Sequence, residues 1–568
     1  MHEIVTLQFG QQANYLGTHF WNAQESYFTY DDPEKGNATA AEPSPVDHDI
    51  HFRPGIGADG SDTFMPRAVI YDLKGAFGSL RKINALYETE DDGNAALWPG
   101  TTVTHRAPAI PPSAYQQALD TGLQPPALTK ETVRYWSDYN RVYYHPKGLI
   151  QLHEYELQSQ LMPFESWAVG DELFDGLDKE HDLLDRDLRP FLEECDQLQG
   201  LQLLTSIDDA WGGFSSRYAE RLRDDFGKLS IWVWGLEEEA AEKKSRSQRL
   251  AQLANHSLSL HSLASTASAY IPLAAASCPA SGRPPPAYLD GASFDPASRW
   301  HTAALQAALV ESASLPSRLR DRGRMAPLAQ MEAVFDNGGN RRVVEARMCV
   351  EREGRLREVL DERVRAKEKE REDGAAGKRT GRTGVVYEDE EGEGEGEGGG
   401  GEWDVDLSRL GPEEQVVAMM KRGKRGGGGG RRGAGGKKAR LFGRAEALRG
   451  AWEGEGEVEA MNRRARDRFA GGPMVQRYTT PLLFPSSLDS YPRIFSFDNE
   501  NNNLAIRTGL STSSATSGRL RAMGLLVGRL VGVDVREELS NGLKSLADEY
   551  EEGWDSGLED GSSEDDDE

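Results

Sequence analysis

Apolar residues run together in four short segments that are typical of strands in a buried sheet. These segments are Glu3–Phe9 (EIVTLQF), Pro66–Leu73 (PRAVIYDL), Gly200–Ile207 (GLQLLTSI) and Lys228–Glu237 (KLSIWVWGLE). Segments with helical spacing follow the first strand, over 10–28, and the third, over 213–226. The order strand, turn, helix, strand predicts an α/β fold with a parallel sheet.

Runs of charge and glycine interrupt this periodicity and divide the chain into five parts. We expect an N-terminal α/β domain over 1–236, an intermediate part over 237–339, an insertion over 340–472, a C-terminal α+β or helical part over 473–546, and an acidic tail over 547–568. The insertion contains EDEEGEGEGEGGGGE and KRGKRGGGGGRRGAGGKK, which cannot bury enough apolar area to offset chain entropy. We therefore expect it to be mostly disordered, with a charged helix over 341–373.

Two further segments are predicted to form helices. Residues 171–199 are typical of a helix in two parts, with the break near Pro190. Residues 515–539 predict one long helix.

Charge and cysteine content narrow the classes of function. The net charge is −27 over 568 residues, and the last 22 residues hold twelve acids and no lysine or arginine. A negative net charge disfavours binding to nucleic acid and to anionic lipid, so we expect no direct nucleic acid binding. Three cysteines without a CxxC pair predict neither a disulfide scaffold nor a zinc site. The sequence shows no targeting presequence and no membrane span, which leaves only peripheral membrane association open.

Three glycine-rich motifs resemble ligand-binding loops without their required context. Residues 55–60 (GIGADG) match a dinucleotide fingerprint, but prolines flank them where a strand and a helix are needed. The segment from Gly374 lacks P-loop spacing, and the basic run over 421–438 is more typical of a solvated linker than of an RNA site. The histidines do not have the spacing of metal ligands, and the sequence has no G-x-S-x-G elbow that would carry a nucleophilic serine. We therefore predict no catalytic residues and no metal.

Two turns that follow strands resemble the nucleotide site of tubulin. The segment EIVTLQFGQQANYLGTHFW resembles the tubulin opening, with Gly10, Gln11 and Asn14 at matching positions and Gln12 in place of a cysteine. PRAVIYDLKG resembles the tubulin turn that ends in D-L-E-P, so Asp72 matches its aspartate, while Lys74 replaces an acid that acts near the magnesium.

A third turn departs from the tubulin pattern. LQGLQLLTSIDDAWGGFSS resembles the segment that ends in the signature GGGTGSG, but Asp208, Asp209 and Ala210 replace its three glycines. Trp211 replaces its threonine, and Gly212 survives. Glycines let backbone N–H groups close on phosphate, whereas two carboxylates reverse the local field. The aspartates can instead cap the following helix.

Taken together, these blocks resemble the Misato family of tubulin-like proteins. The resemblance rests on PRAVIYDLKG, WSDYNRVYYHPKG and FLEECDQLQGLQLLTSIDDAWGGFSSRYAERL, and spans about 1–336, returning faintly over 476–545. It implies a tubulin/FtsZ-like fold whose first domain is of the nucleotide-binding type, followed by a smaller α+β part. The degenerate cleft candidates are then Gln11, Gln12, Asn14, Asp72, Asp208, Asp209 and Gly212.

The Misato resemblance also implies a function. Members of the family take part in partitioning the mitochondrial organelle and in mitochondrial DNA inheritance, and affect mitochondrial distribution and morphology. We therefore expect a non-enzymatic protein without a cofactor, on the cytosolic face of the outer mitochondrial membrane and in the cytoplasm. Its expected partners are proteins of the mitochondrial surface or the cytoskeleton. Two alternatives stay open: a divergent protein that binds GTP or GDP weakly, and a cytoskeletal or tubulin-related adaptor.

Overall fold

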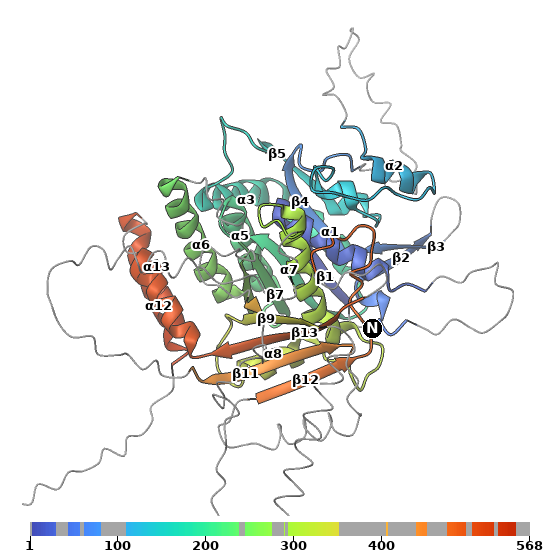
Figure 1. The fold of residues 1–568 in the computed structure, drawn as a ribbon. Coiled ribbons are helices and arrows are strands. Elements are labelled where there is room, and N and C mark those ends of the chain that lie inside the picture. The colour runs from blue at the N-terminus through green and yellow to red at the C-terminus, as the bar shows by residue number, and fades with distance from the viewer. Residues whose placement is uncertain are drawn as a thin grey trace, which may run out of the picture.

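Two large sheets, with helices on both faces of the first, and a separate two-stranded hairpin organise the part of the chain that the structure describes (Figure 1). The computed structural model describes residues 3–29, 44–56, 62–80, 110–237, 245–274, 289, 293–351, 405–406, 439–450, 474–495, 503–527 and 532–551. The glycine motifs after Gly374 and at 421–438, most of the motif over 55–60, and the tail beyond 551 lie outside these residues.

The first sheet has six strands, all parallel, in the order β5-β4-β1-β6-β7-β8. The strands are β1 (Glu3–Phe9), β4 (Ala68–Lys74), β5 (Leu149–Glu156), β6 (Leu198–Ser206), β7 (Ser230–Leu236) and β8 (Ala269–Leu273). The four strands predicted from the sequence form its centre, and the predicted α/β fold is confirmed. The two edge strands escaped prediction, because β5 (LIQLHEYE) is half polar and β8 (AYIPL) is short and contains a proline.

Helices cover both faces of this sheet, as parallel strands require. On one face lie α1 (Gln11–Glu25) and α7 (Arg299–Ser314); on the other lie α3 (Trp167–His181), α5 (Ala210–Asp225) and α6 (Arg246–Thr266). The chain leaves α3 at Asp182, which has a left-handed φ of 45°, and Pro190 lies at the start of the short α4 (Arg189–Leu192). The predicted break near Pro190 was therefore placed too late.

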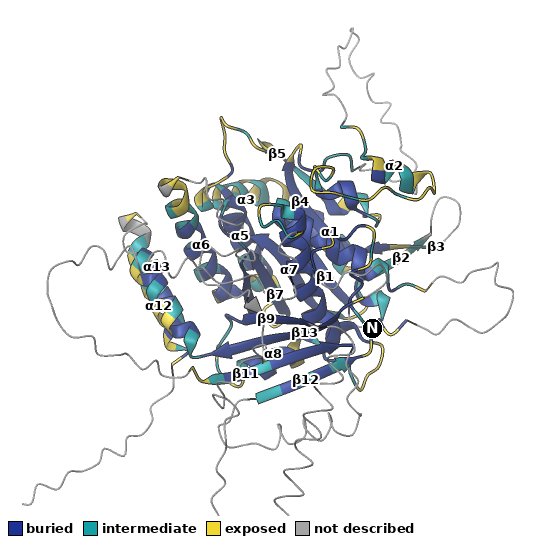
Figure 2. Ribbon diagram, in the orientation of Figure 1, coloured by how far each residue is buried: buried dark blue, intermediate teal, exposed yellow. Residues whose placement is uncertain are grey.

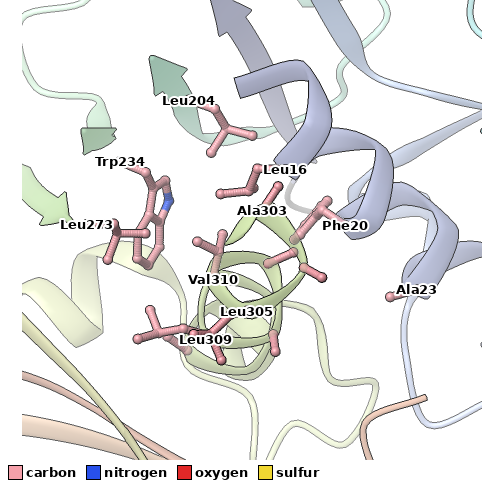
Figure 3. Close-up of a cluster of buried hydrophobic side chains, with 14 of the residues drawn as sticks. Leu16, Phe20, Ala23, Leu204, Trp234, Leu273, Ala303, Leu305, Leu309 and Val310 are labelled. Carbon is pink, nitrogen blue, oxygen red and sulfur yellow. The ribbon is translucent and has the colours of Figure 1, made fainter. Parts of the chain in front are cut away.

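Helix α7 is buried along its whole length, from Trp300 to Ser314. A helix that is buried on all sides belongs inside a molecule rather than on its surface. Figure 3 shows the side chains that surround it. Around α7 lie side chains of α1 (Leu16, Phe20) and of the first sheet (Leu204, Trp234, Leu273). The α7 side chains drawn with them are Ala303, Leu305, Leu309 and Val310.

The second sheet lies beyond α7 and has the order β10-β9-β13-β11-β12. Its strands are β9 (Glu345–Glu351), β10 (Val405–Asp406), β11 (Leu441–Arg449), β12 (Met474–Thr480) and β13 (Ala505–Ser513), and α8 (Leu328–Asp336) packs on it. Both β9 and β11 fall inside the range predicted as an insertion, and β9 falls inside the predicted charged helix. Those two predictions are wrong at these strands, because most of their described residues are buried in the sheet and this packing outweighs the helical preference of the charged residues.

Two antiparallel helices close the described chain, where one was predicted. These are α12 (Ala515–Val527) and α13 (Val533–Asp548), which pack against each other and against α6 (Figure 1). The remaining elements are α2 (Ala114–Asp120) and the hairpin of β2 (Phe52–Ile56) and β3 (Asp62–Pro66). Figure 2 shows that exposed residues concentrate on the outer helices and connections.

A buried ionic network joins the second sheet to the first domain. Glu311 of α7 is fully buried and accepts a hydrogen bond from Arg318 at 2.7 Å, and its other oxygen contacts Arg449 of β11. Tyr27, just after α1, donates to Glu311 at 3.0 Å and accepts from Arg449 at 2.7 Å. One carboxylate therefore ties together α1, α7 and the second sheet.

Candidate functional site

The site begins at the turn between β1 and α1, at the carboxyl edge of the first sheet. Gly10 has φ 86° and ψ 174°, a conformation that is essentially restricted to glycine. The turn places two amide side chains on Asp72 at the end of β4: Gln11 Nε2 donates to Asp72 Oδ2 at 2.5 Å, and Asn14 Nδ2 donates to the same oxygen at 2.6 Å. The structure thus brings Gln11, Asn14 and Asp72 together, as the sequence predicted.

Asp72 is a buried carboxyl group whose described hydrogen-bond partners are neutral. Burial raises its pKa from 3.8 to about 7, although the Leu73 N–H and the two amides favour the charged form. Arg299 adds a weaker electrostatic stabilisation of the charge. Near neutral pH the carboxyl group is consequently poised between its two protonation states.

Gln12 does not belong to this cluster. Its side chain is buried and donates to Gln306 of α7 at 3.0 Å. It therefore fixes α1 against the central helix. Lys74, which the sequence placed near a former magnesium position, is exposed at the end of β4.

The indole of Trp211 occupies the space over Gly10. A Cβ atom built on Gly10 would lie 2.5 Å from Trp211 Cδ1 and Nε1, so the ring contacts the turn directly. Trp211 is 3% exposed and packs edge-on against Phe164, with ring centroids 5.1 Å apart. A phosphate approaching the N-terminal turn of α1 would have to displace this indole.

The two aspartates that replace the signature glycines make different hydrogen bonds. Asp209 is the N-cap of α5, where its Oδ1 accepts from the Trp211 N–H at 2.9 Å, as the capping interpretation predicted. Asp208 is buried and faces α6, where Gln252 Nε2 donates to its Oδ2 at 3.2 Å. The sequence interpretation considered only the charge of the two aspartates, whereas the structure also places the Trp211 indole against Gly10.

Gly212 has a packing role in this arrangement. A Cβ atom at this position would lie 2.1 Å from Ser259 Oγ on α6. The glycine thus permits close approach of α5 and α6. It survives from the signature, but the neighbouring helix explains it without a ligand.

Comparison with known proteins agrees with this geometry. Residues 2–121 match the family model described as the Misato Segment II tubulin-like domain, and residues 125–319 match the Tubulin domain model. Protein DML1 of Phaeosphaeria nodorum is 48% identical over 98% of this chain and 99% of its own length. Protein dml-1 of Neurospora crassa is 44% identical over 99% of each chain. The chain belongs to the Misato family.

An animal relative extends the comparison beyond fungi. Protein misato homolog 1 of Danio rerio is 29% identical over 56% of this chain and 59% of its own length. The resemblance inferred from the sequence is therefore confirmed at the level of family and fold.

A cavity lies next to Tyr15 of α1 in this Misato-family chain. It measures about 600 Å³ and opens between α1, the start of α7 and residues 130–133. Its walls are aromatic and of mixed charge, with Tyr15, Lys130, Glu131, Asp295, Arg299 and Trp300 among them. Lys130 and Asp295 form an ion pair across 3.0 Å, so opposite charges within the wall partly cancel.

A buried histidine close to Asp208 was missed by the sequence analysis. His256 Nδ1 lies 2.8 Å from Glu237 Oε1. Burial alone would lower the pKa of His256, but the charges of Glu237 and Asp208 and the hydrogen bond to Glu237 outweigh it and raise that pKa. The residue sits in an Ala/Leu/Ser helix without a recognisable motif, so no sequence signal pointed to it.

Two further observations concern metal ligands and membrane-spanning helices in the described residues. Within them, no group of three or more His, Cys, Asp or Glu side chains is placed to hold a metal ion. Among the helices in the described ranges, none has the length and apolar character to cross a membrane.

Proposed function

We propose that this Misato-family chain is a non-enzymatic, tubulin-like protein that takes part in partitioning of the mitochondrial organelle and in mitochondrial DNA inheritance. It acts through contacts with other proteins, at the cytosolic face of the outer mitochondrial membrane and in the cytoplasm. The mitochondrial role follows from what family membership implies, and the non-enzymatic character is argued from the site.

The contact between Trp211 and Gly10 carries the non-enzymatic part of the proposal. In a phosphate site of this kind, backbone N–H groups of the turn must reach the phosphate oxygens. Here the indole lies within contact distance of that turn, and the Trp211 N–H is bonded to the Asp209 side chain. Asp72 Oδ2 accepts hydrogen bonds from the Gln11 and Asn14 side-chain amides, so this carboxylate oxygen already has two donors within the protein.

Titration of the full-length protein with a fluorescent GTP analogue, together with a phosphate-release assay, tests this part. We expect neither saturable binding at micromolar protein nor phosphate release. Micromolar binding with turnover that Gln11→Ala abolishes would reverse the conclusion. Trp211→Ala, which removes the indole from Gly10, tests the steric cause: nucleotide binding gained by this variant would identify Trp211 as the obstacle. Its folding must be checked by circular dichroism, because truncating a buried tryptophan costs about 3–5 kcal/mol.

Depletion of the protein in the cells that make it tests the mitochondrial part. We expect fewer copies of mitochondrial DNA and an altered distribution of the organelle, with rescue by the wild-type chain and by Gln11→Ala. Protease treatment of intact mitochondria should remove the bound protein, since the proposed location faces the cytosol. Normal mitochondrial DNA after depletion would refute this role.

The cavity beside Tyr15 favours one alternative, a protein that binds GTP or GDP weakly without turnover. Its wall includes Arg299, which interacts electrostatically with Asp72, and at about 600 Å³ it is large enough for a small ligand. The same titration distinguishes the two, because binding without phosphate release would support the alternative.

A further inference from the structure

The connection between β5 and α3 carries two exposed apolar side chains at its tip. Leu161 is 94% exposed and the adjacent Met162 is 53% exposed, and no other large apolar side chain in the described ranges is as exposed as Leu161. Figure 2 shows this connection as an exposed loop that projects beside β5. Single exposed apolar residues are common on protein surfaces, so exposure alone assigns no function.

The approach to the tip is held by a tight turn. Gln158 has a left-handed φ of 60°, which is uncommon for a residue other than glycine. The Ser159 N–H donates to the Glu156 carbonyl at 3.1 Å, and the Met162 N–H donates to Ser159 Oγ at 3.2 Å. Local hydrogen bonds therefore fix the chain on this side of Leu161.

The exit from the tip is anchored in the candidate site. Phe164 is buried between Tyr155 and Trp211, with ring centroids 4.9 Å and 5.1 Å from theirs. Asn255 of α6 donates to the Glu165 carbonyl at 2.7 Å. The tip is thus preorganised on both sides, so binding a partner costs little additional ordering.

The surface around the tip is acidic. Glu154, Glu156 and Glu165 are exposed and residues 153–166 contain no lysine or arginine, while one exposed lysine, Lys74 of β4, is the register partner of Glu156. The following helix α3 carries five acidic residues and one lysine, and three of these acids are compensated by Arg217 and Arg221 of α5, which leaves α3 and its arginine partners with a net negative charge. This field disfavours an anionic lipid surface and favours a basic protein surface.

We propose that Leu161 and Met162 form a docking tip that inserts into an apolar pocket, edged by lysine or arginine side chains, on a partner protein. The proposal rests on the proposed function, since it names the kind of contact through which the chain would act. Burial of the two side chains supplies the affinity, and the surrounding glutamates select a basic rim.

Site-specific photo-crosslinking tests the tip in cells. A benzoylphenylalanine replaces Leu161 in the full-length protein, and a matched variant carries it at Leu123, which is 67% exposed on a distant connection. We expect a discrete protein adduct from position 161 that position 123 does not give. The crosslinked peptide must contain apolar residues with neighbouring lysine or arginine. A missing adduct, an adduct shared with position 123, or a peptide without basic residues would overturn the proposal.

Binding measurements with the purified partner sharpen the test. We expect Leu161→Ser to weaken binding about tenfold or more, Leu123→Ser to leave it unchanged, and Glu165→Lys to weaken it at low salt only. Both serine variants should keep the wild-type melting temperature, because both side chains are exposed. Equal binding by wild type and Leu161→Ser would contradict the docking tip. Cosedimentation with phosphatidylcholine vesicles that Leu161→Ser abolishes would assign the tip to a membrane and also overturn it.

The two proposals fail in different ways. If depletion leaves mitochondrial DNA unchanged while the crosslink and its Leu161 dependence persist, the proposed function fails and the docking tip stands. If depletion reduces mitochondrial DNA but Leu161→Ser restores it fully, the tip is not the surface through which the protein acts.

Discussion

Asp72 and Glu311 are both fully buried carboxyl groups, yet their surroundings shift their pKa values in opposite directions. Asp72 meets two side-chain amides and a backbone N–H, and burial raises its pKa to about 7. Burial acts on Glu311 in the same sense, but Arg449 and Arg318 outweigh it, so its pKa is lowered. Glu311 forms hydrogen bonds with charged groups, whereas the described hydrogen bonds to Asp72 come from neutral groups and Arg299 adds only a weaker electrostatic interaction.

The difference separates a carboxyl group that ties parts of the fold together from one that lies in the candidate site. A carboxylate held between two arginines stabilises the joint between the two sheets only while it is charged. A carboxyl group with neutral partners at a sheet's carboxyl edge is one whose charge a bound cation would ordinarily compensate. In this chain that edge is filled by Trp211, and Asp72 keeps the amide partners.

The largest expected effect comes from Glu311→Gln, which leaves Arg318 and Arg449 buried without an anion. We expect a loss of about 3–5 kcal/mol in the free energy of unfolding, measured by denaturant titration. Glu220→Gln is the matched control, since Glu220 pairs with Arg217 at the surface and its loss should cost less than about 1 kcal/mol. Equal losses from both variants would show that the buried network has no special role.

The second expected effect is a pH dependence that Asp72 confers. Its folded pKa lies above the unfolded value, so its contribution is fully present below pH 4 and is lost as the pH rises toward 7. The free energy of unfolding of the wild type, measured relative to Asp72→Asn, should fall by up to about 4 kcal/mol across this window. A difference that stays constant with pH, or that rises with pH, would show that burial does not control this carboxyl group.

The smallest expected effect concerns a third, partly exposed carboxylate. Asp209 caps α5 through the Trp211 N–H, so Asp209→Ala should cost about 1 kcal/mol in the free energy of unfolding. Asp224→Ala, at an exposed position near the other end of the same helix, should change it by less than half as much. If Asp209→Ala instead produced nucleotide binding, the aspartate and not the indole would be what excludes phosphate.

Much of the fold could be predicted, because buried parallel strands are apolar throughout. The runs at β1, β4, β6 and β7 were recognised, and the turns that follow two of them gave Gln11, Asn14 and Asp72. The edge strand β5 was missed because one of its sides is exposed. Strands β9 and β11 were missed because they carry charged residues, which find partners inside the sheet. In β9, Glu345 lies 3.3 Å from Arg347, and Glu446 of β11 lies 2.8 Å from Arg477 of β12 and 3.1 Å from Arg507 of β13.

The sequence by itself determined the α/β class, the family and the loss of the glycine signature, since each depends on residues that lie close together along the chain. The tertiary structure alone decided which side chain covers Gly10. Trp211 reaches Gly10, two hundred residues away, only because parallel pairing brings the carboxyl ends of β1 and β6 to the same edge. It likewise decided that Gln12 faces Gln306 and that Glu311 meets Arg449, because the contacts of buried polar groups are set by packing between distant segments.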